Sequence, residues 1–192
     1  MFKIVDGSGD DEDDPLSEEG STPEIKGQVT FTNIVFAYPT RPAYKIYYKK
    51  GDRGGFSLDI GSRQSVAFTG RSGAGKSTAL QLLLRFYRVT WGAAALDGED
   101  VTAMNIGFLR DQIGYVGQMP TLFAGSIRDN IMLGKPDATE EEVIAAAKSA
   151  NAHDFTISMA SGYETDIGVG GALLSGGQRQ RVAIARAIIK NP

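Results

Sequence analysis

The chain has 192 residues, enough for one domain with its own core and a tail. It is 42% hydrophobic and 22% charged, with no cysteine and no apolar run near the roughly 18 residues of a membrane-spanning helix. These figures exclude a disulfide framework, a thiolate metal site and a spanning segment within the sequence, and the first ten residues lack the pattern of a signal peptide.

Residues 1–24 predict an acidic, flexible linker. The net charge of −3 is uneven, because residues 1–26 carry nine acidic and two basic side chains while the remainder is slightly basic. The stretch 6–24 is polar and interrupted by glycine and proline, so it cannot bury enough surface to order itself. The alternative to a solvated linker is an acidic tail that mimics nucleic acid or binds a basic partner.

The following residues, 25–119, predict strands around one helix. Alternating polar and apolar residues indicate strands at 28–38 and 55–60, and apolar runs indicate buried strands at 62–70 and 112–118. A further strand, 93–100, reaches a turn at Asp97-Gly98. The segment 77–87 is apolar on most sides and predicts a buried helix.

Residues 120–192 predict a mainly helical subdomain. Thr139 and Glu142 form the pattern of a capping box at the start of a helix over 138–151. Helices are also expected at 153–160 and 175–190, and Asn191-Pro192 ends the last of them.

The sharpest motif is a candidate phosphate-binding loop between an expected strand and an expected helix. It fits the pattern G-x-x-x-x-G-K-[ST], whose glycines let backbone N–H groups point at phosphate oxygens. Lys76 would add positive charge toward the outer phosphates, Ser77 could ligate Mg²⁺, and the helix dipole favours an anion at the same end. The loop comprises Gly70, Arg71, Ser72, Gly73, Ala74, Gly75, Lys76, Ser77 and Thr78.

A second expected helix start has the same anion-binding features, glycines and free N–H groups, but no lysine. Ser175 is a natural N-cap, and Gly176 and Gly177 would let a phosphate approach the free N–H groups, with Gln178 able to add a hydrogen bond. Glycines inside a helix cost about 1 kcal/mol each relative to alanine, so a gain should offset them. A plain glycine-rich turn is the alternative. The residues leave open whether one chain binds two anions or two chains share one nucleotide.

Together, the loop 70–78 and "LSGGQ" at 174–178 resemble the nucleotide-binding domain of ATP-binding cassette (ABC) transporters, and most closely its multidrug exporter branch. The resemblance extends over about 25–192 and includes "FAYPTRP", "YVGQMP" and "VAIARAIIKNP". It implies an α/β fold with a P-loop NTPase core of ABC type, an antiparallel β subdomain and a helical subdomain.

The resemblance also assigns roles to single residues. Tyr38 resembles the aromatic residue that stacks on adenine, although a strand-end tyrosine is an ordinary feature by itself. Gln118 resembles the glutamine that reaches Mg²⁺ and the attacking water. Lys76 and Gln118 are therefore the catalytic candidates, and Ser77 and Gln118 the metal candidates. In this family, the "LSGGQ" of one subunit closes over ATP held by the loop of another.

Several features depart from the family pattern. Val169 stands where many exporters carry a glutamate that contacts the membrane domains. The segment 44–56 is longer than usual, and its Lys45, Lys49, Lys50 and Arg53 suggest either a solvated hairpin or, less simply, a nucleic-acid contact. His153 does not match the switch histidine and is expected to be structural.

The expected strand ending in Asp-Glu, the D-loop and the switch histidine do not occur after "NP". The sequence thus predicts an incomplete domain that lacks a central strand and is inactive alone.

The expected function is that of a MgATP-binding domain in a membrane exporter. Its partners would be a second nucleotide-binding domain and the transmembrane domains, on the cytosolic side, with no nucleic acid. A soluble cassette ATPase of DNA repair or translation, and a non-catalytic nucleotide-binding module, are the alternatives.

Overall fold

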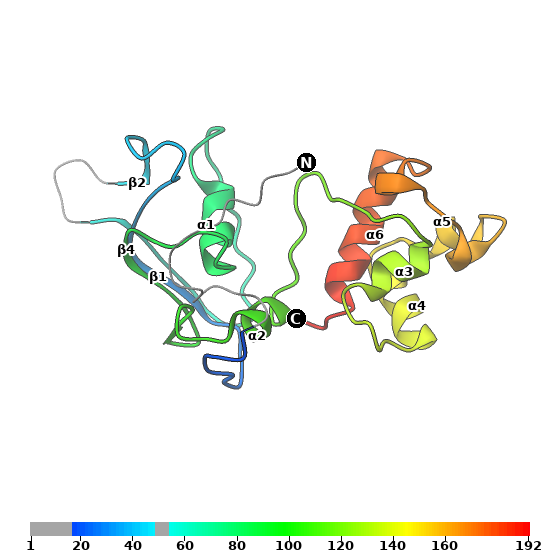
Figure 1. Cartoon of the computed structure of the whole chain (residues 1–192), viewed down its shortest axis with the longest axis horizontal. Coiled ribbons are helices and arrows are strands. Elements are labelled where there is room, and N and C mark those ends of the chain that lie inside the picture. The colour runs from blue at the N-terminus through cyan, green and yellow to red at the C-terminus, as the bar shows by residue number, and fades with distance from the viewer. Residues whose placement is uncertain (1–16, 49–53) are drawn as a thin grey trace. The chain divides into compact units, whose positions relative to one another are not determined.

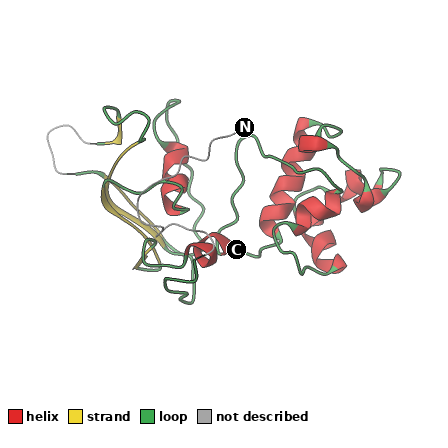
Figure 2. Ribbon diagram, viewed as in Figure 1, coloured by secondary structure: helices red, strands yellow, loops and turns green. Residues whose placement is uncertain are grey.

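A computed structural model describes residues 17–48 and 54–192 of the chain, which divides into two units, 1–110 and 111–192. The strands of the described chain belong to the first unit, and the second is helical (Figures 1 and 2). Lys49, Lys50 and Arg53 of the basic segment lie outside the described residues.

The first unit is built on an antiparallel sheet in the order β2-β1-β4-β5, with β3 also paired to β1. The strand expected at 28–38 is confirmed, and its buried residues Phe31, Ile34 and Phe36 change from odd to even positions between Phe31 and Ile34. The strands are β1 Val29–Ala37, β2 Lys45–Tyr47, β3 Phe56–Ile60, β4 Trp91–Leu96 and β5 Glu99–Asp100.

A bulge interrupts β1 at Asn33, which has a φ of 50°. The register shifts there against both neighbouring strands. Gly55 and Gly92 lie against this point, and a Cβ atom on either would collide with the β1 backbone. The bulge thus explains why both flanking segments carry glycine.

The helix expected at 77–87 is present as α1, Lys76–Leu83, and packs on β4. It ends earlier than expected because Arg85 takes a left-handed conformation with φ 53°. The Phe86 N–H then bonds to the Gln81 carbonyl at 2.8 Å, which closes the helix end in the Schellman pattern. The buried Arg85 side chain donates to the Val101 and Met104 carbonyls at 3.3 and 2.8 Å.

Two predicted strands, 62–70 and 112–118, are not strands in this structure. Both are irregular, and Val66 and Tyr115 are 45% and 42% exposed. An apolar run forms a strand only where another strand completes its hydrogen bonds, and no described strand pairs with either segment. The prediction of buried strands at these positions was therefore wrong for the described chain.

The last part of the acidic segment also differs from a free linker. Ser21 exchanges backbone hydrogen bonds with Ala103 and Asn105, both at 2.9 Å. The Asn105 side-chain amide donates to the Ser17 and Glu19 carbonyls at 2.8 and 3.1 Å. These contacts hold residues 17–21 against the segment between β5 and α2, Ile106–Asp111.

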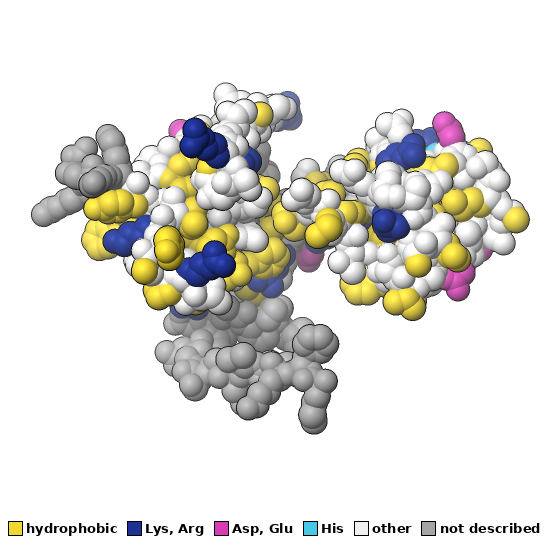
Figure 3. Space-filling view, turned by 90° about the horizontal axis from the view of Figure 1, so that it is seen from above, with side chains coloured by type: hydrophobic (Ala, Val, Ile, Leu, Met, Phe, Trp, Pro, Cys, Tyr) yellow, Lys and Arg dark blue, Asp and Glu magenta, His cyan; other side chains and the backbone are white. Residues whose placement is uncertain are grey.

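The second unit packs its helices around one apolar cluster. Ile127, Ile131, Val143 and Val182 form its centre, each fully buried. Hydrophobic side chains on the face seen in Figure 3 lie scattered over this unit. Its helices are α3 Ile127–Met132, α4 Glu140–Ser149, α5 His153–Ile157 and α6 Gly176–Ile188, with 3-10 turns at Gly162–Glu164 and Val169–Gly171.

The expected capping box at Thr139 and Glu142 is confirmed, since each side chain accepts the other's backbone N–H. His153 bonds through Nδ1 to the Tyr163 hydroxyl at 2.9 Å, a contact inside this unit. Among the described residues, no helix has the length and hydrophobicity needed to cross a membrane.

Candidate functional site

The loop 70–78 wraps around the N-terminus of α1. Gly73 and Gly75 have φ values of 80° and 91°, which only glycine adopts readily, and the Ala74 N–H closes a turn on the Arg71 carbonyl at 3.2 Å. Gly75 caps α1 without any side-chain hydrogen bond, and the first turn contains no acidic residue. The first N–H groups of the helix and its positive dipole end are thus available to an anion.

Lys76 lies over this loop rather than away from it. Its Nζ atom donates to the carbonyls of Gly70 and Arg71, at 2.9 Å each. The ammonium group therefore spans the start of the loop, where it can exchange carbonyl oxygens for phosphate oxygens. Ser77, the next residue, is exposed, whereas Thr78 is buried.

Tyr38 directly follows β1 and reaches α1. Its hydroxyl lies 2.8 Å from both Thr78 Oγ1 and Gln81 Oε1. Its ring meets Phe36 and Tyr87 edge-on, with centroids 5.0 Å away in both cases. The structure thus brings Tyr38 and the loop together, and the hydroxyl contacts fix the ring beside the first turns of α1.

The second predicted anion site is the start of α6. Ser175 Oγ accepts the Gln178 N–H at 3.3 Å, and Gln178 Oε1 accepts the Ser175 N–H at 2.8 Å. Gln178 is therefore part of a capping box, a role that the sequence reasoning did not give it. Ser175, Gly176 and Gly177 are all exposed.

The two glycines of this helix start are not required by the chain itself. A Cβ atom on Gly177 would meet nothing within 4 Å, and one on Gly176 would come no closer than 3.9 Å to the Arg179 side chain. Neither residue has a positive φ. Since neither packing nor conformation demands glycine, the space they leave open is available to something outside this unit.

The remaining site residues lie in the second unit. Gln118 is exposed and belongs to the irregular segment before Pro120. Val169 is 84% exposed, in the turn that precedes the Ser175 helix. No cluster of three or more histidine or acidic side chains that could hold a metal ion occurs in the described parts of the chain.

The comparisons with known proteins identify the family. The sequence model of the ABC transporter family matches residues 54–192. The chain belongs to the ABC transporter family. This ABC domain is 50% identical over 183 residues to Multidrug resistance protein 4 of Entamoeba histolytica. The aligned region covers 93% of the chain and 14% of that relative.

Two further similar proteins are also ABC transporters. ABC transporter B family member 2 of Dictyostelium discoideum is 46% identical over 193 residues, covering 100% of the chain and 13% of that protein. A solved structure of a bacterial Atm1-family ABC exporter with ATP bound has a TM-score of 0.84 and 39% identity, over 92% of the chain and 30% of that one. The ABC domain thus spans only a small part of the relatives it matches, and its ABC-type α/β fold is confirmed.

Sequence reasoning missed two groups around the site. Tyr47 was included in a solvated hairpin, yet it is 8% exposed and belongs to β2. Arg179 was not singled out, yet its Nη1 atom donates to the Leu174 carbonyl at 2.6 Å and fixes the loop before Ser175. No local pattern could have identified Tyr47, whereas arginine four positions after an N-cap is a signal that could be searched for.

Proposed function

We propose that this chain is the nucleotide-binding part of an ABC exporter and that the loop 70–78 binds the phosphates of ATP. The observation that carries the proposal is the start of α1. Its N-cap is a glycine, which offers no side-chain hydrogen bond to the first N–H groups, and its first turn contains no acidic residue. Lys76 Nζ lies 2.9 Å from two carbonyl oxygens of the loop. Free N–H groups, a helix dipole and one ammonium group form a site for a polyphosphate.

Adenine would stack on Tyr38. The Tyr38 ring is held by Thr78 and Gln81, so a base that lies on it is placed at a fixed distance from the phosphate loop. An aromatic face gives modest selectivity for a flat heterocycle, and the loop supplies most of the affinity.

Mg²⁺ fits the same end of α1. Ser77 is exposed in the first helical turn, and a hydroxyl beside phosphate oxygens is the type of oxygen donor that Mg²⁺ accepts. A bound Mg²⁺ would neutralise charge on the terminal phosphates. The resemblance alone assigns Gln118 as a second oxygen donor to Mg²⁺. The role of Gln118 as a catalytic residue follows from the resemblance alone.

The helix that begins at Ser175 would face the ATP held by a second nucleotide-binding domain. Support comes from Gly176 and Gly177, which are exposed and have open space where side chains would stand. Two domains related head to tail would each offer the loop 70–78 to one nucleotide and residues 175–178 to the other.

The complete protein would couple ATP hydrolysis to transport across a membrane, with this domain on the cytosolic side and in contact with transmembrane domains. The names of the relatives, multidrug resistance protein and ABC exporter, support this proposal. The polypeptide 1–192 by itself should bind ATP weakly and hydrolyse it negligibly, because the expected Asp-Glu strand and switch histidine are not within these residues.

The test is Lys76→Ala in a longer polypeptide that supplies the Asp-Glu strand and the segments after it. Loss of the ammonium group should abolish ATP turnover while leaving the fold intact. Undiminished turnover would refute the assignment. Robust phosphate release by the purified 192-residue polypeptide would separately refute the proposal that it is inactive alone.

A further inference from the structure

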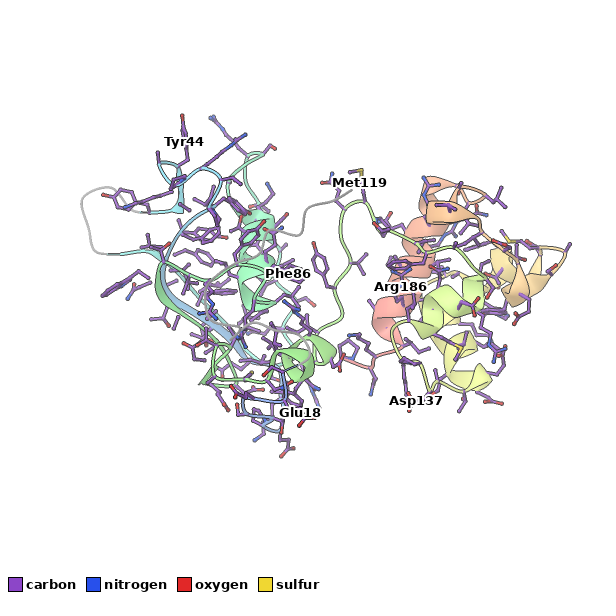
Figure 4. The ribbon with its side chains drawn as sticks, in the orientation of Figure 1. Glu18, Tyr44, Phe86, Met119, Asp137 and Arg186 are labelled. Atoms are coloured by element: carbon purple, nitrogen blue, oxygen red, sulfur yellow. The ribbon has the colours of Figure 1, made fainter. Side chains whose placement is uncertain are left out.

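Tyr47 is fixed beneath the phosphate-binding loop. It ends β2, pairs with Phe36 of β1, and is 8% exposed. Its ring stacks on Phe56 with centroids 4.6 Å apart and planes at 18°. By contrast, Tyr44 is 74% exposed and points away from the ribbon in Figure 4. The Tyr47 ring therefore has a single position, set by two strands.

The Tyr47 hydroxyl binds one particular carbonyl of the loop. It donates to the Gly75 carbonyl oxygen at 2.5 Å, in a buried position. Burial raises the pKa of Tyr47, so the phenol keeps its proton and remains a donor at physiological pH. The ring also lies against Gly75 itself, since a Cβ atom there would be 2.8 Å from Tyr47 Cε1 and 2.7 Å from Ile46 Cγ2.

This hydrogen bond determines where the next N–H group points. The Gly75 carbonyl also accepts the N–H groups of Thr78 and Ala79, at 2.9 and 3.3 Å, so three donors hold it along the helix. The peptide between Gly75 and Lys76 is trans, so its N–H points opposite to its C=O. The Lys76 N–H therefore points away from the helix, beyond its N-terminal end.

We propose that Tyr47 is a positioning residue for the phosphate-binding loop, whose hydroxyl orients the Gly75–Lys76 peptide so that the Lys76 N–H is directed at a bound phosphate. The inference rests on the proposed binding of ATP by this loop. Tyr47 acts through the peptide and does not itself touch the nucleotide.

The hydroxyl can be separated from the packing of the ring. Tyr47→Phe keeps the stacking on Phe56 and the contact with Gly75, and it removes only the donor to the Gly75 carbonyl. That carbonyl keeps its two backbone donors, so the fold should persist while the peptide gains freedom to rotate. The matched control is Tyr48→Phe, at a neighbouring tyrosine that is 56% exposed.

The experiment is an NMR titration of the 192-residue chain, ¹⁵N-labelled, with ATP, inorganic triphosphate and adenosine. Tyr47→Phe should weaken ATP and triphosphate about three- to tenfold, the usual net effect of one hydrogen bond, and leave adenosine within about twofold. It should also shift the Lys76 amide signal before any ligand is added. Tyr48→Phe should change neither the affinities nor that signal.

The alternative outcomes identify what has failed. Unchanged triphosphate affinity in Tyr47→Phe, or an equal loss for adenosine, would overturn the positioning role. Lys76→Ala is titrated in parallel. If Lys76→Ala binds ATP as the wild type does, or if the wild type binds none, the proposed function itself is wrong and the inference about Tyr47 falls with it.

Discussion

Arg186 of α6 and Asn130 of α3 are joined by two hydrogen bonds. Arg186 Nε donates to the Asn130 carbonyl at 2.9 Å, and Nη2 donates to Asn130 Oδ1 at 3.0 Å. Figure 4 shows Arg186 on the red helix of the second unit. A third bond runs from Nη1 to the Thr121 carbonyl at 2.9 Å, and burial lowers the pKa of the guanidinium. The helix that begins at Ser175 is thereby tied to the segment 121–130.

Asn130 is the buried centre of this network, at 1% exposure. Its side chain also accepts the Phe123 N–H at 2.8 Å and donates to the Phe123 and Ser126 carbonyls at 2.9 and 3.0 Å. Asn130→Ala would remove the side-chain partner of the Phe123 N–H and carbonyl and one acceptor of Arg186, whereas the Ser126 carbonyl would keep the Asn130 N–H at 3.1 Å. We expect a loss of about 2–4 kcal/mol in the free energy of unfolding, measured with urea. The control is Gln180→Ala, at an exposed position of α6. If Asn130→Ala lowers the free energy of unfolding no more than Gln180→Ala does, the hydrogen bonds of Asn130 do not stabilise the fold.

Gly177→Ala should lower ATP turnover without lowering the stability of the fold. Since the added methyl group meets nothing within 4 Å and alanine favours helix, the free energy of unfolding should stay constant or rise by up to about 1 kcal/mol. ATP turnover in the proposed exporter should fall, because the methyl group would occupy the space proposed for the second domain's nucleotide.

The matched control for this prediction is Gly134→Ala. There a Cβ atom would collide with the Arg186 carbonyl oxygen, so the same change should destabilise the chain. If Gly177→Ala lowers stability as Gly134→Ala does, the space beside Gly177 is not open. If Gly177→Ala leaves ATP turnover in the proposed exporter unchanged, no nucleotide approaches the helix at Gly177.

The Asp129 carboxylate should make stability depend on pH. The backbone N–H and then the hydroxyl of Ser126 lower the pKa of Asp129 by bonding its ionised form, as part of the capping box of α3. A depressed folded-state pKa stabilises the fold above the unfolded pKa of about 3.9, and this contribution is lost as the pH falls through the folded value.

Asp129→Asn keeps an acceptor for the Ser126 N–H but has no charge to protonate. The fall in unfolding free energy between about pH 6 and pH 3 should therefore be smaller than in the wild type. Urea unfolding at the two pH values measures it. An equal fall in both proteins would show that Asp129 contributes nothing to acid sensitivity.

Asn105 should control access to the N-terminal segment. Asn105→Asp keeps the oxygen that accepts the Phe108 N–H at 2.8 Å, but it removes the amide that holds the Ser17 and Glu19 carbonyls. Cleavage by a glutamate-specific protease after Glu18 and Glu19 should become faster, while the unfolding midpoint changes little. Equal cleavage rates would indicate that other contacts hold these residues.

The sequence by itself determined the parts of this protein that depend on short-range interactions. The loop 70–78, the N-cap at Ser175 and the capping box of Thr139 and Glu142 each involve groups within a few residues of one another. The β1 strand was also predictable, because its alternation records which side faces the core.

Only the tertiary structure decided what depends on a distant partner. The apolar runs 62–70 and 112–118 look like buried strands, but a strand needs a neighbouring backbone, and sequence does not say where that neighbour lies. The Tyr47 bond to Gly75 and the Arg186 bonds to Asn130 join residues 28 and 56 positions apart. Such contacts leave no periodic signal, because folding alone brings their partners within hydrogen-bonding distance.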